Sequence, residues 1–314
     1  MIATYFDGLT AQAGVALGIG DDAALLNRSA DQQLVVATDT LVESVHFPPE
    51  ATAEQIATRA LCVNLSDMAA MGATPRWFTL ALTLPKSLAN ADWLSGFSRG
   101  LASVAKQFNI ALIGGDTTAG PLCISLTLLA EVPGGQALQR SGAKAGDKLY
   151  VTGTLGDGAA ALKTIKNKGN SGSERLLTRF YRPQPQIEAG IKLRNIASAC
   201  IDISDGLIAD LGHICKASDV RCHIQSELLP IHSEVRALGP EQARGWALSG
   251  GDDYQLCFSV PPAHQSKLDQ LIESGELVAT PVGQILAPNN NYKLVTIDDC
   301  SAEPIEGGFD HFSH

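Results

Sequence analysis

Apolar and polar residues alternate along this chain with two different spacings, which predict an ordered series of strands and helices. In the first 140 residues, the β-branched segment Gln33–Thr38 and the alternating segment Trp77–Leu84 are typical of strands. Ala53–Met71 has helical periodicity, and Asp92–Gln107 is predicted as a second helix. The same pattern predicts two further strands, at Ile110–Ile113 and Leu122–Val132.

A second series follows a polar, turn-forming segment at Pro133–Asp147. Its predicted strands are Lys148–Thr152, Ala199–Ile203, Gln255–Val260 and Tyr292–Ile297. Its predicted helices are Asp157–Lys166, Pro185–Ala199, Asp205–Lys216 and Ala263–Glu273. The chain has 314 residues, which is longer than a typical single domain, and it contains two series of elements. We therefore expect an α/β protein of mixed (α+β) sheets with two domains, 1–140 and 141–314.

Composition narrows the class of protein. Hydrophobic residues make up 45% and aromatic residues 5%, which suits a core packed by aliphatic side chains. There is no run of eighteen apolar residues and no basic-then-apolar leader in MIATYFDGLT, so neither a membrane span nor an export signal is expected. A net charge of −10 disfavours binding to nucleic acid or anionic lipid. The seven cysteines form no C-x-x-C pair and are typical of a reduced, cytoplasmic protein.

Aspartates recur beside small, turn-forming residues in six segments. The segments are GIGDD (18–22), TDT (38–40), NLSD (64–67), GGDTT (114–118), DISDG (202–206) and GGDD (250–253). Most follow an apolar segment, so we expect them at strand ends, where α/β folds bind ligands. A single such segment would be ordinary turn or cap chemistry, whereas six in one chain favour a common role.

The position of Asp67 indicates what that role is. Ile56, Ala60, Val63, Asp67 and Ala70 form one stripe of the predicted helix, so Asp67 is expected on its apolar face. Two carboxylates about 4 Å apart repel by roughly 4 kcal/mol at an effective dielectric constant near 20, so converging aspartates require a cation. Oxygen ligands select magnesium or calcium over zinc, and the chain has no EF-hand loop. Magnesium shared with substrate phosphates therefore fits best.

The chain lacks one common nucleotide-binding signature and matches another only in its spacing. The chain has no G-x-x-x-x-G-K-[ST] segment, which disfavours a P-loop kinase. Gly18-x-Gly20-x-x-Ala23 matches the dinucleotide-binding spacing, but Asp21 and Asp22 within it would repel a bare pyrophosphate. No Ser-His-Asp or Cys-His arrangement can be singled out.

Taken in order, the segments resemble those of a known family. They are GIGDDAAL (18–25), TDTLVESVHF (38–47), NLSDMAAMGATP (64–75), IGGDTT (113–118), RSGAKAGD (140–147), VTGTLGDGAAAL (151–162), DISDGLIADLGHI (202–214), WALSGGDDYQL (246–256) and GGFDHF (307–312). This order resembles thiamine-monophosphate kinases, within the superfamily of aminoimidazole ribonucleotide synthetase. The resemblance implies direct, in-line transfer of the ATP γ-phosphoryl group to thiamine monophosphate, assisted by several magnesium ions.

The resemblance also implies roles for individual residues. Magnesium ligands would be Asp22, Thr38, Asp39, Asp67, Asp116, Asp202 and Asp205. ATP would contact Gly115, Asp116, Arg140 and Ser204. Thiamine monophosphate would contact His46, Asp252 and Phe309. Without the resemblance, Arg140 would be interpreted as a surface residue and Phe309 as a packing residue. No catalytic group beyond these metal and phosphate contacts is implied.

Three positions depart from the family pattern. Asp252 stands where the family usually has Glu, Ala37 where it often has Ser, and Phe309 where it often has Tyr. The shorter Asp252 side chain puts its substrate contact in question, whereas Phe309 keeps a face that can stack on a heteroaromatic ring. The family fold is a two-domain homodimer whose N-terminal strands form a barrel with those of the partner, and whose site lies between the domains.

Two alternatives are retained. The first is another enzyme of the superfamily, such as aminoimidazole ribonucleotide synthetase or selenophosphate synthetase. Selenophosphate synthetase is disfavoured because no cysteine precedes Cys62, so a reactive thiol in the N-terminal loop is missing. The other alternative is a non-catalytic scaffold that binds a metal or nucleotide. A complete set of aspartates together with Arg140 favours an enzyme, because a degenerate binder is expected to lose part of that set.

Overall fold

The computed structural model describes residues 5–6, 14–17, 24–27, 30–168, 173–289 and 293–298. The chain divides into two compact units. Unit 1 comprises Met1–Met68 and Ala73–Gly135, and unit 2 comprises Ala69–Gly72 and Gln136–His314. The short segment Ala69–Gly72 groups with unit 2 because Leu138 N–H donates to the Met71 carbonyl and Arg194 Nε to that of Gly72, at 3.0 and 2.5 Å.

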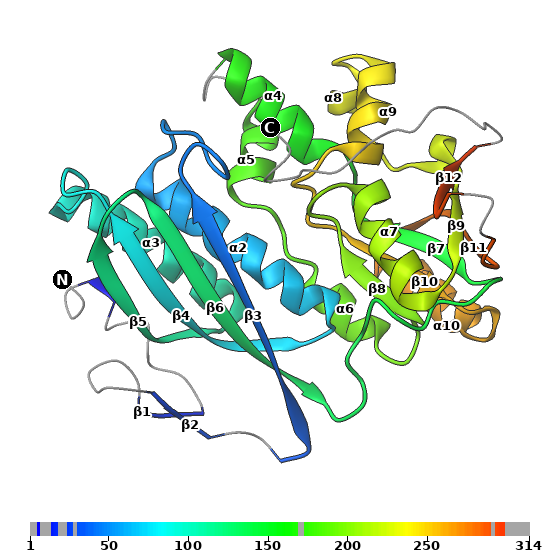
Figure 1. Cartoon of the computed structure of the whole chain (residues 1–314), viewed down its shortest axis with the longest axis horizontal. Coiled ribbons are helices and arrows are strands. Elements are labelled where there is room, and N and C mark those ends of the chain that lie inside the picture. Colours follow the sequence, from blue (N-terminus) through cyan, green and yellow to red (C-terminus); the bar gives the residue numbers. More distant parts are fainter. Residues whose placement is uncertain are drawn as a thin grey trace. The chain divides into compact units, whose positions relative to one another are not determined.

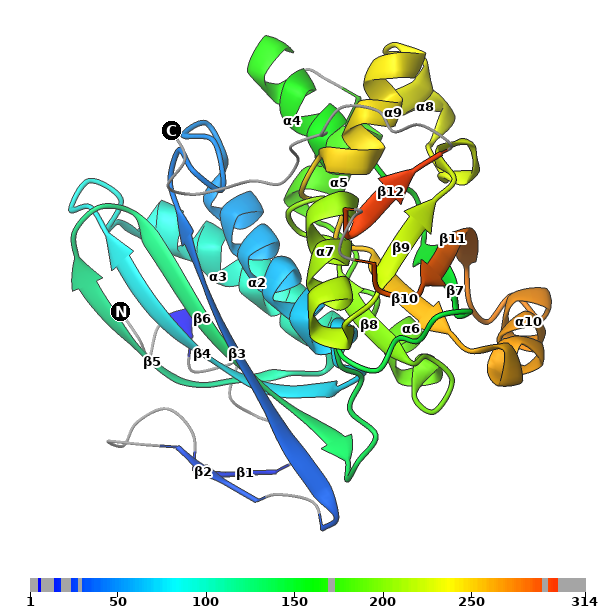
Figure 2. The same ribbon diagram turned by 45° about the vertical axis from the view of Figure 1, so that its right-hand side comes forward.

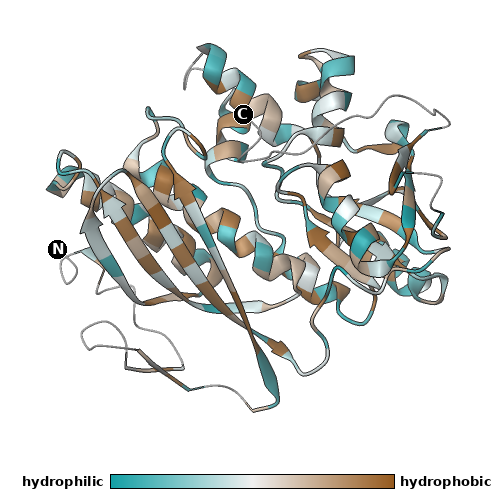
Figure 3. Ribbon diagram, in the orientation of Figure 1, coloured by the Kyte–Doolittle hydropathy of each residue, from teal (hydrophilic) through white to brown (hydrophobic). Residues whose placement is uncertain are grey.

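Unit 1 is a four-stranded sheet with two long helices on one face (Figures 1 and 2). Its strands are β3 (Gln32–Val42), β4 (Thr74–Leu84), β5 (Ala111–Ala119) and β6 (Cys123–Pro133), in the order β3-β6-β4-β5. Its helices are α2 (Ala53–Ala70) and α3 (Ala91–Phe108). Only the β4–β5 pair is parallel, so the sheet is mixed. Figure 3 shows the alternation of apolar and polar residues along the long strands.

The alternation sets the two faces of this sheet. Ile124, Leu126 and Leu128 of β6 are completely buried, whereas the residues between them are half-buried. The opposite face is covered at one end by the two-stranded sheet of β1 (Val15–Leu17) and β2 (Leu25–Leu26). Val15 and Leu26 pack there on the buried Trp77. Elsewhere on that face β3 presents the exposed residues Val36, Thr38 and Thr40.

Unit 2 is built on a six-stranded mixed sheet in the order β12-β9-β11-β7-β10-β8. Its strands are β7 (Lys148–Thr152), β8 (Ala199–Asp202), β9 (Arg221–Ile224), β10 (Leu256–Val260), β11 (Ala279–Leu286) and β12 (Val295–Ile297). Its helices are α4 (Asp157–Lys168), α5 (Glu174–Tyr181), α6 (Ile187–Leu193), α7 (Leu207–Ser218), α8 (Ser233–Arg236), α9 (Pro240–Ser249) and α10 (Gln265–Glu273), with short 3-10 turns at Ser226–Leu228 and Pro262–His264. Only β12 pairs in parallel, with β9.

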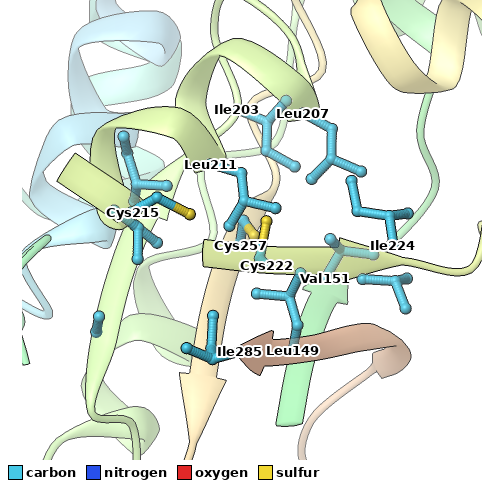
Figure 4. Packing of buried hydrophobic residues seen from close by; sticks show 14 of the residues in the cluster. Leu149, Val151, Ile203, Leu207, Leu211, Cys215, Cys222, Ile224, Cys257 and Ile285 are labelled. Atoms are coloured by element: carbon cyan, nitrogen blue, oxygen red, sulfur yellow. The ribbon is translucent and has the colours of Figure 1, made fainter. Parts of the chain in front are cut away.

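The core of unit 2 lies between this sheet and α7. Leu207, Leu211 and Cys215 of α7 pack against strand residues such as Val151 and Cys257 (Figure 4). All five are completely buried. This packing fixes α7, and therefore the DISDG segment that immediately precedes it, to the end of β8.

Several predicted elements are confirmed, and others need correction. The predicted strand Lys148–Thr152 matches β7, and the predicted helix Asp92–Gln107 matches α3 within one residue at each end. The helix predicted at Pro185–Ala199 is wrong in extent, because α6 ends at Leu193 and Asn195 adopts a left-handed φ of 59°. The elements that were not predicted are β1, β2, α5, α8, α9, β9 and β11. Within the described part of the chain, no helix is long and apolar enough to cross a membrane.

Candidate functional site

Three of the predicted magnesium ligands lie inside strands of unit 1 rather than at strand ends: Thr38, Asp39 and Asp116. β3 continues through Asp39 to Val42, and β5 continues through GGDTT to Ala119. The expectation that Asp39 and Asp116 follow a strand end is therefore wrong. Long ladders with neighbouring strands supply their backbone hydrogen bonds, and this tertiary pairing outweighs the weak strand preference of Gly and Asp.

The register places Asp39 and Asp116 on opposite faces of the sheet. Asp39 pairs with Leu126, which faces the helices, whereas Asp116 pairs with Ala81 on the open face. The two aspartates also lie on opposite edge strands, three strand spacings or about 14 Å apart. Within unit 1 they therefore do not bind the same cation. The two aspartates also differ in burial, since Asp39 is half-buried and Asp116 is exposed. Burial raises the pKa of Asp39.

A glycine fixes the backbone beside Asp116. A Cβ atom on Gly115 would lie 1.9 Å from the Leu80 carbonyl oxygen, so only glycine fits where β5 approaches β4. On the opposite edge strand, the Thr38 hydroxyl hydrogen-bonds that of Thr127 at 2.9 Å on the open face. Thr38 and Asp39 therefore point to different sides of β3.

Asp67 lies near the end of α2, and its surroundings differ from those predicted. The helix is buried on every side from Ile56 to Ser66, so it has no single apolar stripe, and Asp67 is half-buried. Asn64, one turn earlier, is completely buried and donates from Nδ2 to the Ala60 carbonyl at 2.9 Å. Its Oδ1 has no hydrogen-bond partner among the described residues. An oxygen of this kind beside a carboxylate suits a hard cation.

The predicted substrate contact His46 lies in a tight turn after β3. Val42 N–H donates to its Nδ1 at 3.0 Å, and His46 N–H donates to the Val42 carbonyl at 2.9 Å. Arg59 of α2, itself only 2% exposed, donates from Nε to the His46 carbonyl at 2.9 Å. The strand therefore holds the half-buried imidazole of His46, and the helix holds its backbone.

In unit 2, a single buried carboxylate shapes the DISDG segment. Asp210 Oδ2 accepts hydrogen bonds from the backbone N–H groups of Ser204, Asp205 and Gly206 at 3.0, 3.0 and 3.1 Å. Asp202, the last residue of β8, is buried. Burial raises the pKa of Asp210 to about 7, and the charges of Asp202 and Asp205 add to this effect. Asp210 was missed by the sequence analysis because nothing in its spacing distinguishes it from a surface residue of a helix.

The GGDD segment is bound to DISDG by backbone hydrogen bonds. Asp252 N–H donates to the Ser204 carbonyl at 2.9 Å, and Tyr254 N–H donates to the Ile203 carbonyl at 2.8 Å. Asp252 and Tyr254 both have left-handed φ values, 70° and 50°. The Tyr254 hydroxyl donates to Asp252 Oδ1 at 3.0 Å, which orients the predicted substrate contact. Left-handed backbone of this kind is concentrated at functional sites, so GGDD is a candidate functional segment.

Asp253 has a different role from its neighbour. Its side chain is 1% exposed, with Oδ2 accepting from Gly156 N–H at 2.6 Å and Oδ1 from Gly158 N–H at 3.0 Å. It therefore caps the start of α4 from a distant part of the chain. Beside it, Asp157 is buried and paired with Arg175 and Arg179 at 2.7 and 3.1 Å. The second Asp of GGDD was the available signal for this cap, but the sequence does not show which of the pair is buried.

The register brings three loops of unit 2 to one end of the sheet. β7 ends at Thr152 and β8 at Asp202, and the antiparallel β10 begins between them at Leu256. The segments that follow β7 and β8 and precede β10 are therefore neighbours. Here the prediction that an aspartate segment lies at a strand end is confirmed for DISDG, whose Asp202 is the last residue of β8.

Arg140 lies close to the same region. Its side chain is exposed, and its carbonyl accepts from the Ser218 hydroxyl at 3.0 Å. Burial and the nearby charges of Arg140 and Lys216 lower the pKa of His213, while Asp205 opposes them. Arg140 and Asp205 are therefore both near His213 on α7, a residue that the sequence analysis did not select.

Magnesium fits the oxygen donors of these segments if waters and substrate phosphates complete its coordination shell. Of the predicted ligands, Asp22 lies outside the described residues, as does the substrate contact Phe309. Within the described part of the chain, no three His, Cys, Asp or Glu side chains are placed to hold a metal ion. Magnesium needs only one or two carboxylates when waters and substrate phosphates complete its shell. A cation beside Asp202 and Asp205 would also offset the mutual repulsion that contributes to the raised pKa of Asp210.

Comparison with known protein families agrees with this architecture. Residues 20–132 match the model of the AIR synthase related protein, N-terminal domain. Residues 144–293 match that of the AIR synthase related protein, C-terminal domain.

Individual relatives are similar over the full length of the chain. A thiamine-monophosphate kinase of Escherichia coli (strain K12) is 47% identical over 322 residues, covering 100% of this chain and 97% of the relative. The crystal structure of thiamine-monophosphate kinase from Stenotrophomonas maltophilia K279a matches with a TM-score of 0.85 and 46% identity, covering 92% of this chain and 93% of that one. A structure of AaThiL complexed with AMPPCP and TMP matches with a TM-score of 0.80 and 30% identity, covering 94% and 92%. This chain therefore belongs to the thiamine-monophosphate kinase family of AIR synthase related proteins.

Proposed function

We propose that this chain transfers the γ-phosphoryl group of ATP to thiamine monophosphate, giving thiamine diphosphate and ADP. The observation that carries the proposal is the 47% identity to a thiamine-monophosphate kinase over the whole chain. A related structure that holds both AMPPCP and TMP supports the same pair of ligands.

The residue roles belong to this proposal. The magnesium ligands are Asp22, Thr38, Asp39, Asp67, Asp116, Asp202 and Asp205. The ATP contacts are Gly115, Asp116, Arg140 and Ser204, and the substrate contacts are His46, Asp252 and Phe309. Bound magnesium would neutralise phosphate charge and align the two substrates.

The protein itself contributes position and charge. Asp210 holds the backbone of Ser204 and Asp205, and Tyr254 orients Asp252, so these groups meet the substrates in a fixed arrangement. The exposed guanidinium of Arg140 can bind a phosphate through two parallel hydrogen bonds. Transfer is direct and in line, and needs no nucleophile from the protein.

The proposal includes a homodimer formed through unit 1. β3 is an edge strand of eleven residues, and its Leu34 and Val36 are 40% and 55% exposed. Exposed apolar side chains on a long edge strand are typical of a strand that pairs with another chain. A cytoplasmic location is also part of the proposal, and the free thiols of the described cysteines are consistent with it.

Purified protein incubated with thiamine monophosphate, ATP and MgCl2 tests the proposed reaction. We expect equal amounts of thiamine diphosphate and ADP by chromatography, and no product without magnesium. Another phosphorylated substrate, as expected for the synthetase alternative, serves as the comparison. Turnover of such a compound in the absence of any thiamine diphosphate would overturn the proposal.

Two variants separate an enzyme from a binding scaffold. Asp67→Asn and Asp116→Asn each replace a carboxylate by a neutral amide of the same shape, so the fold should survive and turnover should be lost. Circular dichroism checks the fold, and the kinase assay at saturating magnesium measures turnover. Near-normal activity in either variant would contradict the assigned metal sites.

A further inference from the structure

We propose that the backbone N–H of Val42 holds the His46 ring in the tautomer that carries its hydrogen on Nε2, and that Arg59 holds the backbone of the same turn in place. The imidazole then donates that hydrogen to the phosphate of thiamine monophosphate. This inference rests on the proposed function, which assigns His46 to the substrate. Arg59 acts through His46 and is therefore a positioning residue.

The turn that carries His46 is tightly specified. Ser44 adopts a left-handed φ of 65°, and its N–H donates to the Phe47 carbonyl at 2.8 Å. Phe47 is 2% exposed and anchors the end of the turn in the core. The N–H groups of Val45 and His46 both donate to the Val42 carbonyl, at 3.2 and 2.9 Å. These backbone hydrogen bonds fix the main chain of His46 independently of the contacts of its side chain.

The hydrogen bond from Val42 determines the tautomer. A backbone N–H can only donate, so His46 Nδ1 must accept with its lone pair at 3.0 Å. In a neutral imidazole the hydrogen must then be on Nε2, at the opposite side of the ring. An Nε2–H group is a donor, which suits the oxygen of an anionic phosphate and cannot serve a donor group of a ligand. This tautomer therefore suits a ligand group that accepts hydrogen bonds.

Arg59 fixes the same turn from the helix side. Its side chain is 2% exposed on α2, and its Nε donates to the His46 carbonyl at 2.9 Å. The guanidinium is planar and permanently charged, so this contact does not change with pH in the physiological range. Val42 and Arg59 hold the ring and the backbone of His46 respectively, and both contacts lie within unit 1.

Two substitutions of His46 separate the two ring nitrogens. His46→Asn places an oxygen near the position of Nδ1, so it can keep the bond from Val42 but has no group at Nε2. His46→Gln places an amide N–H near the position of Nε2, so it can keep the donor. We expect His46→Asn to raise the KM for thiamine monophosphate roughly tenfold to a hundredfold, the effect of losing one hydrogen bond to a charged group. We expect a smaller rise for His46→Gln and an unchanged KM for ATP in both.

Arg59→Met and Arg59→Lys test the positioning role. Arg59→Met removes the donor to the turn, whereas Arg59→Lys can restore one. We expect Arg59→Met to raise the KM for thiamine monophosphate at least severalfold with kcat within about twofold. Arg59→Lys should recover part of that loss. Long-range proton–nitrogen spectra of histidine-labelled protein report the tautomer, with the His46 signals identified by their absence in His46→Gln.

The outcomes distinguish this inference from the proposed function. If the wild-type protein makes no thiamine diphosphate, the proposed function is wrong, although the spectrum still reports the tautomer of His46. If it makes thiamine diphosphate but His46→Asn has a normal KM, or His46 carries its hydrogen on Nδ1, this inference is wrong and the function stands. A folded Arg59→Met variant with unchanged KM and unchanged His46 signals would remove Arg59 from the account.

Discussion

Replacing Asp253 by Asn should change how the stability of the protein depends on pH. Asp253 is completely enclosed, and both its carboxylate oxygens accept backbone N–H groups at the start of α4. Burial raises its pKa from 3.8 to about 7, although the N–H groups of Gly156 and Gly158 act in the opposite direction. The unfolded chain loses this proton near pH 4, whereas the folded protein keeps it until about pH 7.

The sign and size of the effect follow from this difference. Between these two pKa values the folded state binds more protons than the unfolded state, so the free energy of unfolding falls as pH rises. From pH 5 to pH 8 the contribution of Asp253 amounts to a loss of about 2 to 3 kcal/mol. Asn does not titrate, so Asp253→Asn lacks this loss. The variant is instead less stable by about 1 to 3 kcal/mol at every pH, because the Nδ2 donor of Asn faces a backbone N–H group.

Urea denaturation of both proteins at pH 5, 6, 7 and 8 measures the effect. We expect the stability gap between wild type and Asp253→Asn to narrow by about 2 kcal/mol as pH rises. Asp269→Asn is the matched control, because the same substitution on the exposed surface of α10 should leave the pH dependence as it is in the wild type. Parallel curves for wild type and Asp253→Asn would refute the assignment of a titrating, buried Asp253.

Three further substitutions test the other contacts. Asp210→Ala leaves three N–H groups of the DISDG segment without their acceptor, and we expect at least a tenfold loss of kcat and a lower melting temperature, with Asp210→Asn intermediate. Gly115→Ala forces a Cβ against the Leu80 carbonyl and should cost about 1 to 3 kcal/mol in urea denaturation. Gly114→Ala meets nothing within 4 Å, so equal costs for these two would contradict the packing argument. Asp157→Asn breaks the pairing of a buried carboxylate with Arg175 and Arg179, and should lower the free energy of unfolding by about 3 to 5 kcal/mol in thermal melts. A change within about 0.5 kcal/mol would show that this pairing is unimportant.

The elements that the sequence predicted well are those whose own periodicity is strong. α3 is amphipathic along its length, and Asn90 caps its start by accepting from Trp93 N–H at 3.0 Å. β7 is a short run of apolar residues beside turn-forming ones. In both, local preference and burial agree, so neighbouring residues suffice to predict the element.

Elements that depend on distant partners were missed or cut short. β5 was predicted to end at Ile113 because Gly114 and Gly115 are poor strand residues, yet ladder bonds to β4 extend it to Ala119. β11 carries Pro281 and Gly283, and a bulge between them allows it to pair with β7. Pairing energy of this kind comes from residues far along the chain and leaves no local pattern.

By itself the sequence showed an acidic chain, predicted oxygen ligands in ordered segments, and carried a resemblance that the full-length comparisons confirm. Only the tertiary structure decided how those residues are divided. It put Asp39 and Asp116 on opposite faces of one sheet, since side chains alternate with a period of two and each register is set by pairing. It also separated Asp253, a buried cap, from the half-buried Asp252. Burial depends on which distant segments pack around a residue, and adjacent positions in a sequence cannot encode that difference.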